Sequence, residues 1–319
     1  MNSQIELDNI IEVISKANKI GIFTHINPDG DAIGSSMALF LGLRKINKDV
    51  EIVADEYSRC FNFLSSLDLV KKEGNGGYDL AIALDCATRG RLYDPNSSFD
   101  NSIINVVIDH HESNTFFGKF NYVEDRSPAT CKTLVKVLKR LNVELDKEIG
   151  ECLMAGIITD TGGFRYDTVD DETFELAALM LDLGVNISDI YYRTFDIKTK
   201  AQFKLTAIAS ERLKFYCDGK VALTYLTRED FVKTKSSVGD HEGIVNIGRN
   251  VEGVEVSIFL REDLEGVYKV SLRSNSYVNV SDVALAFAGG GHNRAAGLTI
   301  EDNLDVAIKK LVKETKKRL

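Results

Sequence analysis

The chain of 319 residues has no tryptophan, only three prolines and no CxxC pair among its five cysteines. An odd number of cysteines without metal-site spacing favours buried free thiols in a reducing compartment over disulfides or a zinc–thiolate site. No stretch approaches the roughly 18–20 apolar residues of a membrane span. The N-terminus also lacks the basic region and apolar core of a signal peptide. We therefore expect a cytoplasmic protein that contacts no membrane.

Positive charge is also scarce, because 48 acidic residues outnumber 39 basic ones and the formal net charge is −9. This balance argues against a large basic surface for duplex DNA. A small anionic substrate stays compatible with it, and part of the acidic excess could bind metal ions. Apolar residues make up 44% of the chain, which is enough for a sizeable core.

The first half of the chain alternates short, β-branched apolar runs with helical or loop segments. This alternation predicts an α/β fold with a parallel sheet and helices on both of its faces. The expected strands are 19–24, 49–55, 78–85 and 102–109, and the expected helices are the N-terminal segment, 32–46, 128–141, 146–158 and 171–183.

The second half has the pattern of a smaller α+β domain. Alternating runs predict half-buried strands, and the run before the C-terminus predicts a helix, a glycine loop and another strand. The expected strands are 220–227, 254–262 and 268–274, followed by the mixed segment 280–300 and a helix over 303–318. We place a catalytic domain at 1–185, a linker at 186–200 and a second domain at 201–319.

Acidic side chains follow the ends of the expected strands in the first domain. The turn "HINPDGD" carries His25, Asp29 and Asp31 after the first strand, and two later strands end on Asp85 and Asp109. In open α/β sheets, ligands bind beyond the carboxyl ends of the strands. We therefore expect these groups to meet at one edge.

Asp160, in "AGIITDTGGFRY", is a further contributor to the same edge. Several carboxylates this close cannot all stay ionised without cations. Mixed imidazole and carboxylate ligands suit Mn, Fe, Co, Ni or Zn, and paired ions are the recurring arrangement for hydrolysing phosphate esters. Any one of these Asp residues alone could be only a helix cap or a turn residue. The candidate metal ligands are His25, Asp29, Asp31, Asp85, His110 and Asp160.

Taken in order, the motifs resemble those of the DHH phosphoesterase superfamily. The matching segments are "HINPDGDAIGSS", "ALDCA", "VIDHHES" and "ITDTGGFRY", and "GGGHNRAAG" is similar to the signature of the associated DHHA1 domain. The layout resembles the nanoRNase/pAp phosphatase subfamily. The resemblance implies hydrolysis of very short RNA oligonucleotides to mononucleotides and removal of the 3′-phosphate of 3′-phosphoadenosine 5′-phosphate (pAp).

The resemblance also implies two divalent ions, Mn²⁺ first among them, with Mg²⁺, Fe²⁺ or Co²⁺ as alternatives. His25, Asp29 and Asp85 would bind the first ion. The second ion would be bound by Asp31, Asp85, His110 and Asp160, with Asp85 bridging. Asp109 would orient its surroundings, and His111 would face the scissile phosphate to stabilise charge or assist the leaving group.

The glycine segment before "HNRAAG" follows an expected helix rather than opening one, so it is not a Rossmann or P-loop fingerprint. Its glycines still permit close approach of the backbone to an anion. Arg273 ends a strand and could clamp a phosphate with two hydrogen bonds. The resemblance implies that Arg273, Gly290, Gly291 and His292 hold the nucleotide or terminal phosphate across a cleft between the two domains.

Arg91 could reach the same phosphate, although a helix-surface role is an equal alternative. Arg249 and Asn250 are weaker candidates for contact with a base or sugar. The chain has 16 Phe and 11 Tyr residues, and sequence alone does not single out one that stacks on a base.

Several functions share these motifs. A phosphodiesterase for cyclic di-AMP or its linear product pApA would carry all of them. A manganese pyrophosphatase would match only the first domain, a RecJ-type exonuclease would need an added single-strand-binding domain, and a non-catalytic module would not need every ligand. The expected partners are therefore short RNA and pAp, then pApA or cyclic di-AMP, and a second copy in a homodimer by analogy.

Overall fold

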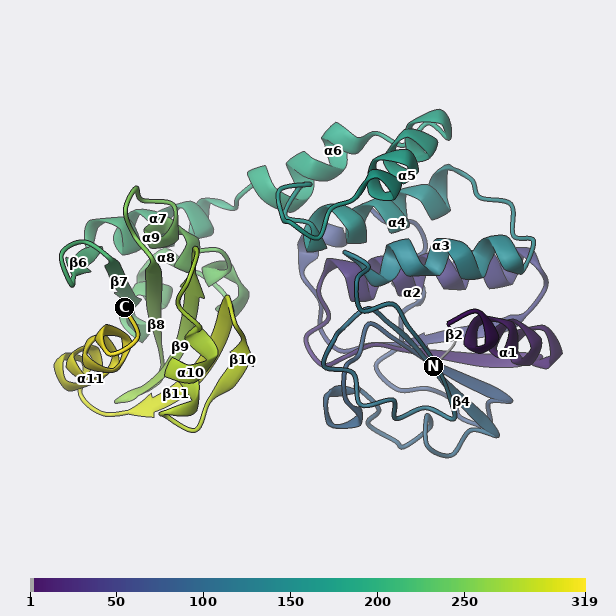
Figure 1. The fold of residues 1–319 in the computed structure, drawn as a ribbon, viewed down its shortest axis with the longest axis horizontal. Coiled ribbons are helices and arrows are strands. Elements are labelled where there is room, and N and C mark those ends of the chain that lie inside the picture. The colour runs from purple at the N-terminus through teal and green to yellow at the C-terminus, as the bar shows by residue number, and fades with distance from the viewer. Residues whose placement is uncertain (1–2) are drawn as a thin grey trace. The chain divides into compact units, whose positions relative to one another are not determined.

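The computed structural model describes residues 3–319, apart from the side chains of Ser3, Val238 and His292. The chain divides into two compact units, Met1–Ile197 and Lys198–Leu319 (Figure 1). Each unit has its own sheet and its own hydrophobic core.

The first unit is built on a five-stranded sheet with the order β2-β1-β3-β4-β5, in which every neighbouring pair is parallel. The strands are β1 (Lys19–Phe23), β2 (Asp49–Val53), β3 (Leu80–Leu84), β4 (Ile104–Asp109) and β5 (Phe120–Val123). The predicted parallel α/β sheet is confirmed. The edge strand β5 was not predicted, because its four residues carry little apolar alternation.

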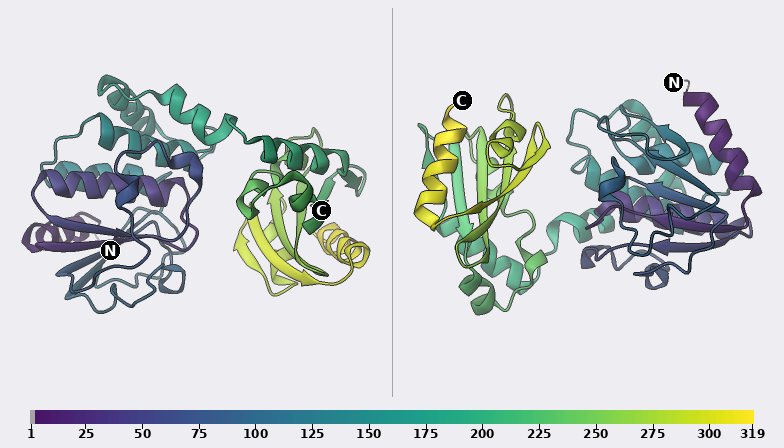
Figure 2. Two further views of the ribbon diagram at one scale, coloured as in Figure 1. Left: turned by 180° about the vertical axis from the view of Figure 1, so that it is seen from behind. Right: turned by 90° about the horizontal axis from the view of Figure 1, so that it is seen from below.

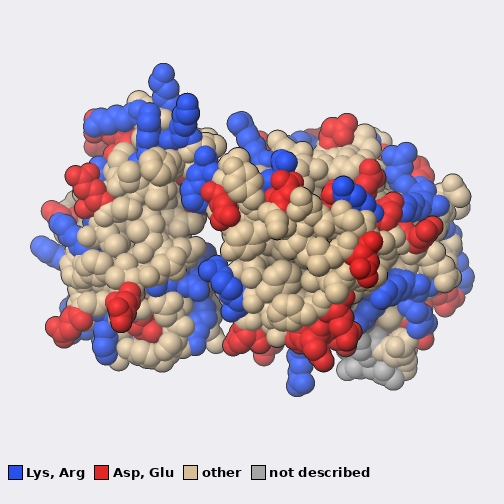
Figure 3. All heavy atoms as spheres, turned by 90° about the horizontal axis from the view of Figure 1, so that it is seen from above, with Lys and Arg blue, Asp and Glu red and all other residues tan. Residues whose placement is uncertain are grey.

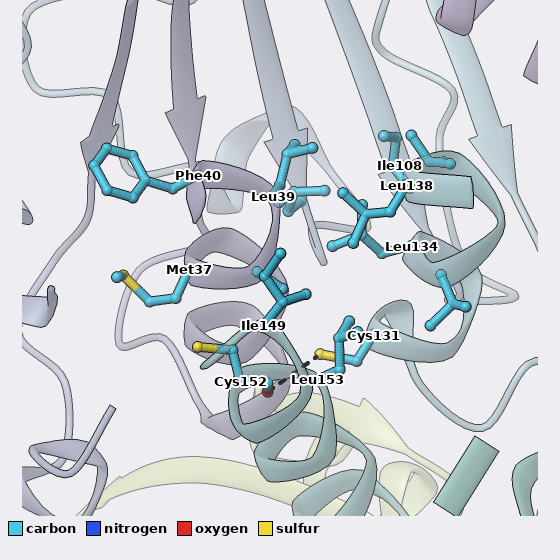
Figure 4. Close-up of a cluster of buried hydrophobic side chains, with 14 of the residues drawn as sticks. Met37, Leu39, Phe40, Ile108, Cys131, Leu134, Leu138, Ile149, Cys152 and Leu153 are labelled. Atoms are coloured by element: carbon cyan, nitrogen blue, oxygen red, sulfur yellow. Dashed lines mark hydrogen bonds between the residues drawn. The ribbon is translucent and has the colours of Figure 1, made fainter. Parts of the chain in front are cut away.

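Helices cover one face of this sheet. The helices of this layer are α1 (Ser3–Lys16), α2 (Gly30–Lys45), α3 (Thr130–Arg140) and α4 (Lys147–Asp160). Figure 4 shows Met37, Leu39 and Phe40 of α2 with side chains of α3 and α4 in the core beneath the strands. Gly156 lets α4 approach α2, because a Cβ there would lie 2.6 Å from Oδ1 of Asp31.

The opposite face of the sheet carries no helix among the described residues. Phe23, Ala83 and Val107 pack there against Leu92 and Phe99, which belong to the irregular connection between β3 and β4. That connection contains only the short 3₁₀ turn η3 (Arg89–Arg91). The expectation of helices on both faces is therefore wrong for this face, where a loop supplies the apolar cover.

The end of the first unit is also helical. The helix α5 (Asp171–Asp182), the short helix α6 (Ile187–Tyr191) and the π-helical turn η4 (Tyr192–Asp196) follow α4, and both α5 and α6 contact it. The guanidinium of Arg193 lies over the ring of Phe63, 5.6 Å from its centre. Most of the segment 186–200 is thus regular structure rather than extended chain.

The second unit has a six-stranded sheet with the order β10-β11-β9-β8-β7-β6. Only β7 and β8 pair in parallel. The strands are β6 (Lys214–Tyr216), β7 (Val221–Leu226), β8 (Val256–Leu264), β9 (Val267–Ser274), β10 (Gly290–His292) and β11 (Ala295–Glu301), and the helices are α7 (Lys200–Glu211), α8 (Arg228–Thr234), α9 (Val245–Arg249), α10 (Val280–Leu285) and α11 (Leu304–Lys316). The expected α+β architecture is confirmed, while β6 and α7–α9 were not predicted.

Alternation along β9 separates two faces of the second sheet. Val270 and Leu272 lie in the core that α10 and α11 cover. Side chains point alternately to opposite faces of a strand, so Lys269, Ser271 and Arg273 share the other face. Figure 2 shows α11 lying along one side of this sheet.

The outer surface mixes charges of both signs. On the face shown in Figure 3, acidic and basic side chains are interspersed, with uncharged areas between them. Within residues 3–319, no helix is both long enough and apolar enough to cross a membrane.

Candidate metal centre

The turn after β1 brings one histidine and two carboxylates to the carboxyl edge of the sheet. Asp29 is the N-cap of α2, and its Oδ1 accepts hydrogen bonds from the main-chain N–H groups of Asp31 and Ala32 at 3.0 and 3.2 Å. The alternative of a helix cap therefore holds for Asp29. Capping does not take Asp29 away from the site, because the same Oδ1 also faces Nε2 of His25.

The first group of candidate ligands is His25, Asp29 and Asp85, whose ligand atoms lie within 4.8 Å of one another. Nε2 of His25 is 3.9 Å from Oδ1 of Asp29 and 3.8 Å from Oδ2 of Asp85. Nδ1 of His25 lies 2.9 Å from the carbonyl oxygen of Ile26. A carbonyl only accepts, so Nδ1 carries the proton and the lone pair of Nε2 faces the carboxylates.

The second group is Asp31, His110 and Asp160. Nε2 of His110 lies 4.0 Å from Oδ2 of Asp31 and 3.1 Å from Oδ2 of Asp160. Nδ1 of His110 lies 2.9 Å from the carbonyl oxygen of Ser127, so its Nε2 also faces inward. Asp160 is the last residue of α4 rather than the end of a strand.

Asp85 lies between the two groups. Its Oδ2 faces His25, while its Oδ1 is 3.5 Å from Nε2 of His110. Asp85 is buried and has a left-handed backbone with φ of 55°, which costs a non-glycine residue about 1 kcal/mol or more. The strained backbone thus occurs at the residue whose carboxylate faces both His25 and His110.

The N-terminus of α3 binds the two innermost carboxylates. The main-chain N–H groups of Thr130 and Cys131 donate to Oδ2 and Oδ1 of Asp31 at 2.5 and 2.9 Å. The hydroxyl of Thr130 donates to Oδ1 of Asp85 at 2.9 Å. Helix N-termini favour anions. Sequence reasoning missed Thr130 and Cys131, although a threonine near the start of the expected helix 128–141 was the available signal.

Three carboxyl groups of the cluster have raised pKa values, because they are buried close together without enough positive charge nearby. Burial, with repulsion from Asp160, raises the pKa of Asp31 to about 7. Burial and the charges of Asp31 and Asp29 raise the pKa of Asp85 to about 7, and burial above all raises that of Asp160 to about 6. These raised pKa values mean that the ionised forms of the three buried carboxyls are disfavoured here, and a divalent ion would favour them by competing with protons. The donor set therefore fits divalent metal ions.

Asp109 and His111 form a pair next to the ligands, and His111 also makes a third group of candidate ligands with Asp85 and His110. The buried carboxylate of Asp109 accepts a hydrogen bond from Nδ1 of His111 at 2.7 Å and one from the amide of Asn114 at 2.5 Å. Burial lowers the pKa of His111, but the hydrogen bond to Asp109 together with the charges of Asp85 and Asp109 outweighs it, so that the pKa is raised. Asn114, which also donates to the carbonyl of Cys86 at 3.2 Å, is a third residue that sequence reasoning missed.

Arg91 lies next to the same turn. Its carbonyl oxygen accepts a hydrogen bond from the main-chain N–H of Ile26 at 2.8 Å, and Leu92 forms a β-bridge with His25. The Arg91 side chain is exposed. The structure thus places Arg91 beside the candidate metal ligands through its backbone.

Two of the predicted substrate residues of the second unit, Arg273 and His292, lie at paired positions across three strands. Arg273 of β9 pairs with Ala295 of β11, and Ala295 pairs with His292 of β10. The side chain of His292 lies outside the described residues. Gly290 and Gly291 belong to β10, so the expected glycine loop is instead a short antiparallel strand. Gly291 has φ of 143°, and a Cβ there would lie 2.6 Å from Cα of Ala296, so strand pairing itself requires a glycine.

Comparison with known proteins agrees with this arrangement. The family model "DHH family, N-terminal domain" matches residues 19–157, and the DHHA1 domain model matches residues 218–317. A Thermus thermophilus protein named bifunctional oligoribonuclease and PAP phosphatase NrnA is 34% identical over 94% of this chain and 90% of its own. The Bacillus subtilis protein of the same name is 24% identical over 91% and 92%.

Solved structures show the same fold. An exopolyphosphatase-related protein from Bacteroides fragilis superposes with a TM-score of 0.92 at 28% identity, covering 98% of this chain and 96% of that one. The exonuclease RecJ bound to manganese has a TM-score of 0.56 at 13% identity, over 100% and 95% of the two chains, and shares the fold alone. The fold and the paired histidine–carboxylate groups define a metal-dependent phosphoesterase. The chain belongs to the DHH family and carries the associated DHHA1 domain.

Proposed function

We propose that this chain is a cytoplasmic phosphoesterase that hydrolyses very short RNA oligonucleotides to mononucleotides and removes the 3′-phosphate of pAp. The similarity to the Thermus thermophilus relative, whose name states both activities, supports these substrates. The single observation that carries the chemistry is Asp85, whose two oxygens face two separate groups of candidate ligands.

We assign one divalent ion to His25, Asp29 and Asp85, and a second to Asp31, Asp85, His110 and Asp160. Mn²⁺ is the proposed ion, since mixed imidazole and carboxylate ligands suit it better than Mg²⁺. When bound, the ions supply Lewis acidity that activates water and neutralises charge on the reacting phosphate.

The chain's own residues orient the ligands and hold a proton. The carbonyls of Ile26 and Ser127 fix the rings of the two liganding histidines. Asp109 stabilises the protonated form of His111, so that its Nε2 can donate to a phosphate oxygen or to the leaving oxygen. Asp109 is thus proposed as a positioning residue, and His111 as the group that meets the phosphate.

The second unit would bind the rest of the substrate. We propose that Arg273, the backbone of Gly290 and Gly291, and His292 hold the terminal phosphate or nucleotide, with Arg91 contributing from the first unit. The proposal keeps a catalytic domain at 1–185, a linker at 186–200 and a substrate-binding domain at 201–319. Arg273 and His292 both pair with Ala295, one from each side, and this supports a joint role.

The test is turnover with Mn²⁺ on a panel of pAp, pApA, cyclic di-AMP, RNA of two to five nucleotides, a long RNA and pyrophosphate. We expect pAp and the shortest RNAs to be cleaved best, and Asp85→Asn to remove all activity. Dominant cleavage of cyclic di-AMP or pApA would move the substrate assignment to those nucleotides. Full activity of Asp85→Asn would overturn the metal site itself.

A further inference from the structure

We propose that Tyr277 is a platform on which one base of the substrate stacks. The proposal rests on the proposed function, because it names how the second unit recognises a nucleotide rather than a bare phosphate. The argument begins with how this side chain is presented.

Tyr277 is exposed and lies directly before a buried segment of the chain. Its side chain is 55% exposed, whereas the following Val278 is 2% exposed and Val280 is fully buried. One exposed aromatic is common on protein surfaces. Tyr277 differs in that hydrogen bonds hold the main chain of its loop in place.

A buried carboxylate holds the loop that presents Tyr277. Glu255 is only 6% exposed, and its Oε1 accepts hydrogen bonds from the main-chain N–H groups of Tyr277 and Val278, both at 2.8 Å. Oε2 of Glu255 accepts a further hydrogen bond from the main-chain N–H of Ser276 at 3.1 Å. Charge-assisted bonds to three consecutive N–H groups hold this backbone in one conformation. A stacking surface that is rigid beforehand loses little entropy when a base binds.

Asn275 fixes the start of the same loop. Its amide donates to the carbonyl oxygens of Arg249 and Val254, both at 2.8 Å, and its Oδ1 accepts from Nε of Arg249 at 3.2 Å. The guanidinium of Arg249, at the end of α9, is therefore held at the start of the loop that presents Tyr277. Cationic groups together with stacking aromatics are the usual means of binding single-stranded nucleic acid.

The loop lies at the end of the sheet that carries the proposed phosphate clamp. It begins directly after β9, two residues beyond Arg273. The N–H of Ser274 donates to the carbonyl of Arg294 at 3.1 Å, and the N–H of Val280 donates to that of Asn293 at 2.9 Å. Both ends of the loop are thus bonded to the turn that follows β10. Arg273, the turn 293–294 and Tyr277 lie at one end of one sheet.

The other exposed aromatic side chains described in this unit lie elsewhere. Phe203 is on α7, and Phe215 is on β6, at the opposite edge of the sheet. Among these three, Tyr277 is the one next to the strand that carries Arg273. Phe215 is therefore a matched control for an aromatic outside the proposed site.

The kinetic test compares Tyr277→Ala, Tyr277→Phe and Phe215→Ala in the full chain. For an RNA dinucleotide, loss of one stacking contact predicts a KM raised roughly 5- to 100-fold in Tyr277→Ala, with kcat nearly unchanged. Tyr277→Phe and Phe215→Ala should match the wild type. An abasic dinucleotide should show no difference among the four proteins. An equal loss by Tyr277→Ala on both substrates, or no loss on either, would overturn the platform.

A binding test uses the absence of tryptophan from the chain. Tyr277→Trp supplies the only indole, and stacking with adenine should quench its fluorescence when AMP is added with Mg²⁺ present. Ribose 5-phosphate should have no effect, and neither compound should affect Phe215→Trp. Equal responses to AMP at both positions would contradict the proposal. If the wild-type protein cleaves RNA but these differences are missing, Tyr277 is not a stacking platform, while the proposed function stands. If the wild-type protein has no activity on RNA or pAp, the proposed function itself is overturned.

Discussion

Oδ2 of Asp31 accepts a 2.5 Å hydrogen bond from the main-chain N–H of Thr130, which lies 99 residues later in the chain. The hydroxyl of the same threonine holds Asp85. One residue at the start of α3 thus orients both of the buried carboxylates of the candidate metal centre. The backbone N–H of Thr130 bonds to Asp31, and its side-chain hydroxyl bonds to Asp85.

Replacing Thr130 by valine should weaken metal binding without unfolding the protein. Valine keeps the shape and the N–H to Asp31 but lacks the hydroxyl that orients Asp85. Partners of metal ligands typically contribute about 10- to 100-fold in metal affinity. We expect a loss of this size in Mn²⁺ affinity by titration calorimetry, and Thr130→Ser should restore most of it. Wild-type affinity in Thr130→Val would show that the hydroxyl has no such role.

The metal-free protein should lose stability as the pH rises from 5 to 8. Asp31 and Asp85 have pKa values of about 7 and Asp160 of about 6 in the folded protein, against roughly 3.9 in an unfolded chain. Groups with raised pKa values stabilise the fold while protonated, and that contribution disappears as the pH rises through the folded values. Burial opposes the charge of His110, but the nearby carboxylates raise its pKa, which acts in the same direction.

Bound metal should reverse this trend. Mn²⁺ competes with protons for the same atoms, so the difference in Tm between Mn²⁺-loaded and EDTA-treated protein should widen from pH 5 to pH 8. Thermal melts in both conditions measure it. The measurement is confined to pH values above 5. Glu51 and Asp170 have pKa values lowered to about 2, so their stabilising contributions are lost only at more acidic pH and do not disturb the comparison. A constant difference in Tm across the window would argue against proton–metal competition.

Asp109→Asn should change the pH profile of the reaction more than it changes metal binding. The carboxylate of Asp109 raises the pKa of His111, so its removal should lower that pKa. We expect the alkaline limb of kcat against pH to move to lower pH and the maximal rate to fall, while Mn²⁺ affinity stays within a few-fold. Loss of metal binding in proportion to activity would instead identify Asp109 as part of the metal centre.

The two glycines of β10 should differ in their effect on stability. Gly291→Ala would place a Cβ 2.6 Å from the carbonyl oxygen of Ala295 at a positive φ, which should cost about 1–3 kcal/mol. Gly290→Ala finds no atom within 4 Å and should melt within a degree or two of the wild type. Thermal unfolding of both variants checks this. A rise in KM of the stable Gly290→Ala would then report substrate contact rather than misfolding.

Arg273→Ala should raise KM for short RNA much more than it affects bis(p-nitrophenyl) phosphate, an ester without a second phosphate for the clamp. Arg273→Lys should recover only part of the loss, because lysine cannot form the paired hydrogen bonds of a guanidinium. Steady-state kinetics on both substrates measure the contrast. Equal losses on the two substrates would contradict a role in holding the terminal group.

The sequence was sufficient to place most of the candidate site because parallel strands end at one edge. Asp85, Asp109 and the turn carrying His25, Asp29 and Asp31 follow apolar runs whose β-branched composition identifies them as buried strands. The same reasoning failed for the loop that covers the second face of the sheet. Nothing in the local pattern of residues 86–103 shows that Leu92 and Phe99 replace a helix there.

Local sequence also misjudged the glycine segment of the second domain. Three consecutive glycines favour a loop, yet β11 supplies the hydrogen bonds that make Gly290–His292 a strand. The left-handed φ of Asp85 and the burial of Glu255 were also not predictable from local sequence. Each depends on partners far along the chain.

What the sequence by itself determined is therefore the succession of most strands and helices, the family, and the residue types available at the sheet edge. These depend on periodicity and on motifs within a few residues of one another. Tertiary structure alone decided which oxygen of Asp85 faces which histidine, how Thr130 and Asn114 orient the carboxylates, and where the loop of Tyr277 lies. The physical reason is that hydrogen bonds and pKa values depend on distances of a few ångströms between side chains, and those distances exist only once segments up to about a hundred residues apart have packed together.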